Sequence, residues 1–138
     1  MNRHEVFITN VVKCRPPENR DPLPTEIDVC TKNYLFRQIA LIDPKVIVTL
    51  GRFSMGLFFP NGKITAIHGQ VKWQDGRAYL PMFHPAAVLR NMAGLKTQAE
   101  ADMKKLPEIV AEAKRRASER QAAAANKPEE PPTQLGLF

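Results

Sequence analysis

Four side chains in this sequence have types and positions that could do chemistry. Cys14 and Cys30 are the only cysteines among the 138 residues, and a loop rich in proline and arginine separates them. Asn10 ends an apolar stretch, and its amide can both donate and accept hydrogen bonds. His84 follows another apolar stretch and precedes Pro85. Two thiols, an amide and an imidazole are groups suited to metal binding and to directed hydrogen bonding.

Each of these residues also has a plainer explanation. Two cysteines in such a chain are most often buried free thiols, and a histidine after a strand can simply cap a helix or pack. Against this, the order His84-Pro85 places the imidazole where a strand gives way to a helix, at the rim where open α/β sheets bind ligands. The apolar residues 6–9 predict a short strand that ends on Asn10.

The hydrophobic pattern predicts strands that alternate with helices around these residues. A helix is expected from about Glu26 to Ile42, and Thr25 and Asp28 are spaced like a capping box with Asp in place of Glu. The nearly continuous apolar run 45–50 suits a buried parallel strand. The later elements are expected to be a helix at 52–58, a strand at 64–67, a hairpin through Asp75-Gly76, a strand at 78–83 and a long helix from Leu95 to about Ala125, divided or kinked at Pro107. The pattern implies an α/β sandwich with a parallel sheet.

The composition limits the classes of protein to which this chain can belong. The 138 residues suffice for one domain, and 43% hydrophobic residues can build a core. The sequence contains no run of eighteen apolar residues, so no membrane association is expected. Two cysteines argue against a disulfide framework. The net charge of +6 favours an anionic partner such as nucleic acid.

Two motifs carry a resemblance to a known family. The segment ITNVVKCRPPENRDP, followed by a second cysteine after fifteen intervening residues, resembles the second half of the iron–sulfur uracil-DNA glycosylases, family 4. The segment HPAAVLRN resembles that family's motif HP(S/A)xxLR. The resemblance implies a three-layer α/β sandwich with a parallel sheet, DNA containing uracil as the partner, and a cytoplasmic, nucleoid-associated protein. It implies that Asn10 binds a flipped uracil, that His84 donates to a uracil carbonyl, and that Cys14 and Cys30 are two of the four thiolate ligands of a [4Fe–4S] cluster.

Four arginines are further candidates because of their charge and position. Arg15, Arg20, Arg52 and Arg90 could neutralise DNA phosphates, although an arginine in a solvated surface needs no such role.

The resemblance covers roughly Glu5 to Leu106, and this chain starts inside the family's N-terminal part. The family's preceding part contains the other two cluster cysteines, a glycine- and proline-rich loop with an acidic residue, and an aromatic residue that stacks on uracil. It also contains the first strand of the sheet, which lies between the strands that hold Ile8 and Ile47 here. We therefore expect this chain to be a truncated gene product, a product of a mis-assigned start codon, or one half of a split protein. It is not expected to hold a normal cluster alone.

Three functions remain open from the sequence. The first is hydrolytic removal of uracil from DNA by a glycosylase that uses Asn10 and His84. The second is a catalytically inactive fragment that binds DNA or a sliding clamp, or one half of a split glycosylase. The third is a zinc protein that uses both cysteines and a histidine, although no histidine has zinc-site spacing to either cysteine.

The expected organisation has three parts. Residues 1–110 form the glycosylase-like domain, residues 111–126 a solvated helical extension, and residues 127–138 a tail that begins with a linker composition and is expected to be disordered. The tail ends in QLGLF, which resembles the bacterial sliding-clamp-binding pentapeptide QLxLF. The residues that carry this match are Gln134, Leu135, Leu137 and Phe138. A tail that folds back on the domain is the alternative.

Overall fold

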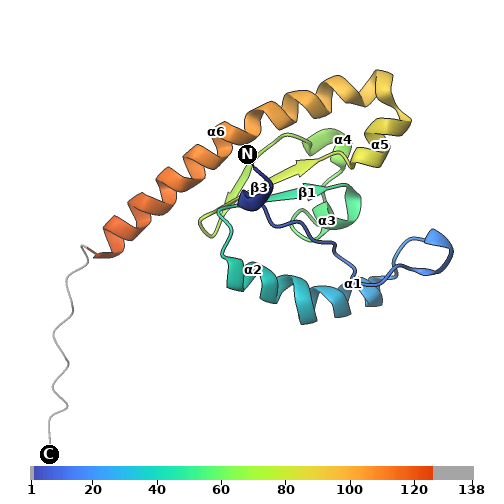
Figure 1. Ribbon diagram of the computed structural model, residues 1–138, viewed down its shortest axis with the longest axis horizontal. Coiled ribbons are helices and arrows are strands. Elements are labelled where there is room, and N and C mark those ends of the chain that lie inside the picture. Colours follow the sequence, from blue (N-terminus) through green and yellow to red (C-terminus); the bar gives the residue numbers. More distant parts are fainter. Residues whose placement is uncertain (1, 126–138) are drawn as a thin grey trace, which may run out of the picture.

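The computed structural model describes residues 2–125, and Figure 1 shows helices on both sides of a small sheet. The sheet has the strand order β1-β3-β2. Strand β1 (Val46–Leu50) pairs in parallel with β3 (Arg77–Met82), and β2 (Lys72–Gln74) pairs with β3 in the antiparallel sense. The α/β class is thus confirmed, with a mixed sheet in which the parallel pair is β1 and β3.

The antiparallel pair is the hairpin that the sequence predicts. Asp75 and Gly76 connect β2 to β3 with φ values of 51° and 80°. Positive φ at both central residues is what a two-residue type I′ turn requires, and this turn matches the twist of the strands that it joins.

The core lies between β3 and the long helix α6 (Met92–Ala125). Alternate residues of β3 point to one face of the sheet. They pack against residues of α6 that are spaced one helical turn apart. The resulting buried cluster consists of Ala78, Leu80 and Met82 from β3 and of Leu106 and Ile109 from α6. On the opposite face the ring of Tyr79 packs against Phe58, with 5.0 Å between ring centroids. Both faces of β3 are therefore covered.

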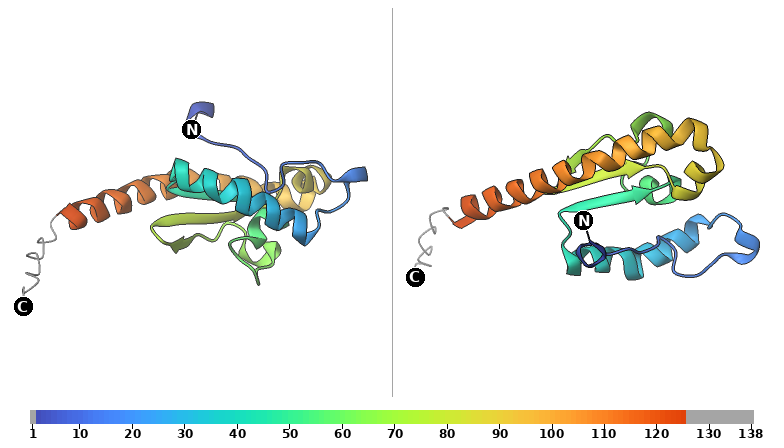
Figure 2. Two further views of the ribbon diagram at one scale, coloured as in Figure 1. Left: turned by 90° about the horizontal axis from the view of Figure 1, so that it is seen from below. Right: turned by 45° about the horizontal axis from the view of Figure 1, so that its top comes forward.

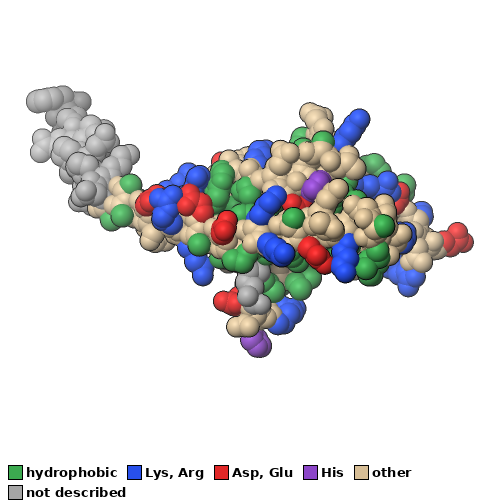
Figure 3. Space-filling model, turned by 90° about the horizontal axis from the view of Figure 1, so that it is seen from above, with side chains coloured by type: hydrophobic (Ala, Val, Ile, Leu, Met, Phe, Trp, Pro, Cys, Tyr) green, Lys and Arg blue, Asp and Glu red, His purple; other side chains and the backbone are tan. Residues whose placement is uncertain are grey.

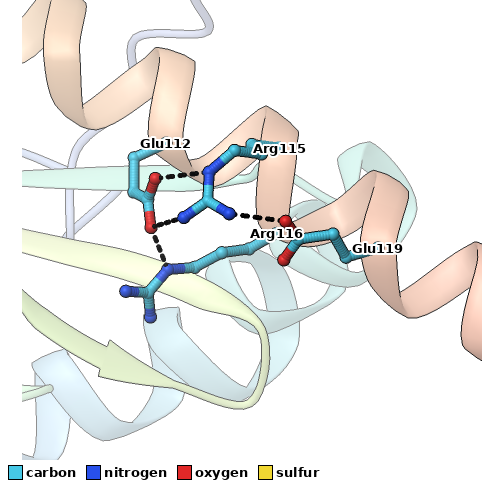
Figure 4. A network of polar contacts seen from close by, with 4 residues as sticks. All are labelled: Glu112, Arg115, Arg116 and Glu119. Atoms are coloured by element: carbon cyan, nitrogen blue, oxygen red, sulfur yellow. Dashed lines mark hydrogen bonds and ion pairs between the residues drawn. The ribbon is translucent and has the colours of Figure 1, made fainter.

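Helix α6 runs on without interruption through Pro107 to Ala125, so Pro107 lies inside one helix and does not separate two. Ala113 is still fully buried. Around it, a network of ion pairs on the helix surface joins Glu112, Arg115, Arg116 and Glu119, as drawn in Figure 4. The guanidinium of Arg116 also lies over the ring of Trp73, 4.0 Å from its centroid, and so joins this part of α6 to the hairpin. The domain boundary at residue 110 stays a prediction.

A second long helical segment lies on the β1 side of the sheet (Figures 1 and 2). It is built from α1 (Pro24–Cys30), a π-helical stretch η3 (Thr31–Leu35) and α2 (Phe36–Ile42). The helix begins at Pro24, and the backbone N–H of Leu23 donates to the Glu26 carboxylate at 2.8 Å. The capping box predicted at Thr25 and Asp28 is therefore wrong by two residues, because proline favours the first helical position.

The remaining elements are short. They are η1 (Arg3–Glu5), η2 (Pro17–Asn19), α3 (Arg52–Gly56), α4 (Ile64–Ile67) and α5 (Pro85–Arg90). The strand predicted at Ile64–Ile67 is wrong, because these residues form α4. Both edges of β3 are already paired with β1 and β2, and the backbone N–H of His68 donates to the carbonyl of Ile64 at 3.0 Å. Among residues 2–125, no helix is both long and apolar enough to cross a membrane.

The strand predicted at residues 6–9 is also wrong. These residues belong to no strand, and Phe7 and Ile8 are 58% and 67% exposed. The segment instead contacts α2, where the hydroxyl of Thr9 donates to Gln38 at 3.4 Å. A strand needs a neighbour for its backbone groups. The resemblance places another strand between this segment and β1, and no strand among residues 2–125 occupies that position.

Candidate functional site

His84 stands at the carboxyl end of β3 as the N-cap of α5. Its exposed ring accepts a hydrogen bond at Nδ1 from the backbone N–H of Ala86, at 3.1 Å. A neutral imidazole that accepts at Nδ1 carries its proton on Nε2. The first turn of α5 thus fixes the tautomer, and His84 presents an N–H donor to whatever binds at this rim.

Gly51 holds His84 from the β1 side. Its backbone N–H donates to the carbonyl of Met82 at 2.9 Å, and its φ is 86°. A Cβ at Gly51 would lie 3.0 Å from the Cβ of His84, which is tighter than ordinary van der Waals contact. The turn therefore needs glycine to let the end of β1 and His84 approach.

The loop with the cysteines lies against the end of α1. The backbone N–H of Lys13 donates to the half-buried Sγ of Cys30 at 3.4 Å, and Cys14 is exposed. Asn10 is exposed, and its backbone carbonyl accepts from the Lys13 ammonium at 2.9 Å. Asn10 and His84 share no hydrogen bond within residues 2–125, so this part of the chain does not link the two predicted site residues by a hydrogen bond.

All four candidate arginines are exposed, and each one has a partner within the chain. Arg20 forms an ion pair with Glu26 at 2.7 Å, and Arg52 forms one with Asp21. Arg15 donates to the side chain of Asn19 at 2.6 Å, and Arg90 donates to the backbone carbonyl of Ala86 at 3.1 Å. Their role in binding phosphates stays a prediction. Figure 3 shows basic and acidic side chains interspersed over the face that it presents.

Two of these pairs shape the loop. The hydrogen bond from Arg20, with a second one from the Leu23 backbone, lowers the pKa of Glu26 to about 2. The contact between Arg52 and Asp21 joins the proline-rich loop to the residue that follows Gly51. Since Gly51 lies close to the side chain of His84, this ion pair connects the cysteine loop to the rim of the sheet.

The described residues do not fit a four-thiolate cluster. Residues 2–125 contain no group of three or more histidine, cysteine, aspartate or glutamate side chains that could hold a metal ion. Cys14 and Cys30 are the only thiols in the sequence. Two thiolates meet half of the usual requirement of an iron–sulfur cluster.

One polar cluster was missed by the sequence reasoning. The Asp102 carboxylate, on α6, lies 2.6 Å from Nδ1 of His68, although the two residues are 34 positions apart. Asp102 is 2% exposed. The available signal was its spacing, because Asp102 precedes Leu106 and Ile109 by four and seven residues and so falls on the apolar stripe of the helix.

Comparison with known proteins agrees with this arrangement. The family model of the uracil DNA glycosylase superfamily matches residues 1–106. The chain therefore belongs to the uracil DNA glycosylase superfamily. It is 44% identical over 124 residues to a type-4 uracil-DNA glycosylase of Sulfurisphaera tokodaii, a match that covers 83% of this chain and 56% of that protein.

Two further relatives have the same name. A type-4 uracil-DNA glycosylase of Archaeoglobus fulgidus is 41% identical over an alignment of 118 residues that covers 79% of this chain and 58% of the relative. One of Thermotoga maritima is 45% identical over an alignment of 95 residues that covers 66% of this chain and 48% of the relative. The resemblance to family 4 is confirmed, and the chain spans about half the length of the curated relatives that it matches.

Proposed function

We propose that this protein acts in DNA repair as a uracil-DNA glycosylase, which hydrolyses the N-glycosidic bond between uracil and deoxyribose. The observation that carries the proposal is the fixed tautomer of His84, whose Nδ1 is occupied by the Ala86 N–H at 3.1 Å. The exposed Nε2–H is a preorganised donor for an oxygen that becomes negative during the reaction. Membership of the superfamily supports the same chemistry.

The steps follow from the groups present. A base inside a duplex cannot reach a pocket in the protein, so the nucleotide must be flipped out. The Asn10 amide can donate and accept, so it can pair with the edge of uracil and disfavour cytosine, which has an amino donor where uracil has O4. As the glycosidic bond breaks, negative charge grows on uracil O2, where a hydrogen bond from His84 lowers the barrier. Water then attacks C1′.

The test uses single- and double-stranded oligonucleotides that contain one uracil, with alkaline cleavage at the abasic product as the readout. In the form of the protein that excises uracil, His84→Ala and Asn10→Ala are each expected to lower the rate at least roughly tenfold, because the loss of one such donor typically costs a hundred- to a thousandfold. His4→Ala is the matched control, since His4 lies in η1 outside the candidate site. Excision at the wild-type rate by both site variants would refute the assignment.

A second candidate is a protein that binds DNA without cutting the glycosidic bond. The observation that favours it is that Asn10 and His84 share no hydrogen bond within residues 2–125, while the four candidate arginines are exposed on the described surface. Binding of uracil-containing DNA in a gel-shift assay, without any abasic product over hours, would support this candidate over the glycosylase.

We also propose a bacterial sliding clamp as a partner. Residues 134–138 read QLGLF, and they lie outside the described residues. Leu137 and Phe138 would fill an apolar pocket on the clamp while Gln134 makes polar contacts. Because a short peptide loses conformational entropy on binding, the affinity is expected to be on the order of micromolar.

Calorimetric titration of the clamp tests this partner with the full chain and with a peptide of residues 127–138. The matched variant changes both Leu137 and Phe138 to Ala. Binding that disappears in the variant is the expected result, and equal binding by both forms would remove the proposal. A clamp and DNA as partners would agree with the predicted location at the cytoplasmic nucleoid.

A further inference from the structure

A buried carboxylate lies behind the candidate site and is not used by the proposed reaction. The Asp102 side chain is 3% exposed and has two partners. One carboxylate oxygen is 2.6 Å from Nδ1 of His68, and the other is 3.0 Å from the ammonium of Lys105. A buried charge is strongly unfavourable unless it is paired and hydrogen-bonded. These two partners therefore make the burial of the Asp102 carboxylate possible.

The contacts determine where the proton of His68 lies. An ionised carboxylate only accepts hydrogen bonds, so Nδ1 of His68 must carry a proton. Lys105 already balances the charge of Asp102, and it also donates to the carbonyl of Gly69 at 3.3 Å. A proton on Nδ1 of His68 therefore satisfies the hydrogen bonds of the cluster. This tautomer is the opposite of the one that Ala86 imposes on His84.

The same cluster fastens α6 to the end of β3. The backbone N–H of Gly69 donates to the carbonyl of Pro81 at 2.8 Å. A Cβ at Gly69 would overlap the Asp102 carboxylate, so the backbone at this corner lies directly on the buried charge. His68 and Gly69 are thereby held between helix and strand by hydrogen bonds at both positions.

The His68 ring reaches the candidate site through one aromatic neighbour. Its centroid lies 4.5 Å from that of Phe83, and the two rings are tilted by 38°. Phe83 is 7% exposed and directly precedes His84 in the chain. On the other side, a Cβ at Gly51 would lie only 3.0 Å from the Cβ of His84. His84 is thus held between Gly51, which lies close to its side chain, and the stack of Phe83 on His68.

We infer that His68 and Asp102 are positioning residues for His84. Asp102 fixes the imidazole of His68, the imidazole supports the Phe83 ring, and this support sets the direction in which the Nε2–H of His84 points. The role in catalysis rests on the proposed glycosylase function, whereas the positioning itself is a property of the structure that can be measured without any reaction. Donors at a reacting centre lose much of their effect when they are displaced by about an ångström.

The test is nuclear magnetic resonance of the full chain with ¹⁵N-labelled histidines, whose long-range correlations report the tautomer of each ring. In the wild type, His68 is expected to carry its proton on Nδ1 and His84 on Nε2. His68→Ala and Asp102→Leu are expected to shift the ring signals of His84 and to mix its tautomers. Ile109→Val is the matched control, because it weakens the same interface between α6 and β3 away from the cluster. It should lower the thermal midpoint and leave the His84 signals unchanged.

A purely structural role of the cluster predicts a different result, in which the variants lose stability while the signals of His84 stay in place. That result, or a wild-type His68 without a fixed Nδ1–H, overturns the inference. If the two variants do not fold, Asp102→Asn is measured instead, because it keeps the shape of the side chain and one oxygen acceptor. Unchanged signals of His68 and His84 in this variant would also overturn the inference. Where uracil excision is measurable, His68→Ala should lower kcat roughly ten- to a hundredfold with little change in KM. A chain that excises no uracil refutes the proposed function and leaves the magnetic resonance result standing.

Discussion

A histidine becomes a directed hydrogen-bond donor only when its other ring nitrogen is occupied. The sequence predicts that His84 lies at the rim of the sheet, because an apolar run precedes it and Pro85 follows. It does not predict the tautomer, which depends on the backbone N–H of Ala86 at 3.1 Å in the first turn of α5. The partnership of His68 with Asp102 could not be predicted either, because 34 residues separate them and only the packing of α6 on β3 brings them together.

Glu26 allows a residue-scale prediction about pH. Its pKa is lowered from 4.5 to about 2 by the hydrogen bond from Arg20 and then by the one from the Leu23 backbone. A carboxylate whose folded-state pKa is depressed stabilises the fold above the unfolded pKa, and this stabilisation is lost as the pH falls through the folded pKa. Glu26→Gln should therefore have a lower thermal midpoint than the wild type above about pH 5.

The difference between the two midpoints should shrink as the pH falls from 4.5 toward 2. Thermal unfolding followed by circular dichroism over this range is the measurement. Asp28→Asn is the control, because Asp28 lies in the same helix and forms an exposed pair with Lys32 that is 2.8 Å long. A difference for Glu26→Gln that is constant with pH would show that the Arg20–Glu26 contact does not survive in solution.

At the scale of elements, local sequence patterns were sufficient to predict the secondary structure where one face of the segment is buried. The apolar run of β1, the Asp75-Gly76 hairpin and the helical spacing of 26–42 were all predicted and are present. The two wrong strand predictions concern short apolar segments whose strand conformation depended on a neighbour. Residues 64–67 meet a β3 with both edges paired, and residues 6–9 meet no adjacent strand in the described part of the chain. Hydrophobic pattern alone cannot supply a pairing partner, so such segments take their conformation from the tertiary context.

The packing of α6 on β3 gives an element-scale prediction. Leu106 is 8% exposed within the cluster formed with Leu80 and Met82. Leu106→Ala is expected to reduce the free energy of unfolding by about 2–5 kcal/mol, since it leaves a cavity that the helix and strand cannot fully close. Met103→Ala, one turn earlier and 55% exposed, should change it by less than about 0.5 kcal/mol. Urea denaturation measures both, and equal effects would mean that α6 does not cover β3 in solution.

At the scale of the whole molecule, the sheet has three strands and a single parallel pair. The outer edge of β1 has no strand partner among residues 2–125, and the exposed residues Phe7 and Ile8 lie on the segment that the family resemblance places one strand away. The candidate site also lacks one of its expected contacts. His84 is positioned from both sides by Gly51 and Phe83, whereas Asn10 makes no hydrogen bond with it in the described part of the chain. The sequence nominates Asn10 and His84 as site residues, which stays a prediction, and it could not predict the contacts of Gly51 and Phe83 around His84.

The thiols lead to the last prediction, that the 138-residue chain alone does not form a stable [4Fe–4S] cluster. Such a cluster usually requires four thiolates, and this chain has two, Cys14 and Cys30. Cys30 already accepts a backbone hydrogen bond from Lys13 at 3.4 Å, and no further ligand group accompanies the pair within residues 2–125. After anaerobic reconstitution and desalting, the visible charge-transfer absorbance should be absent and iron should be far below four atoms per chain. The Cys14→Ser, Cys30→Ser double variant gives the background of adventitious iron. About four retained irons per chain, lost in the double variant, would contradict the prediction and would mean that two thiolates and non-thiolate ligands suffice here.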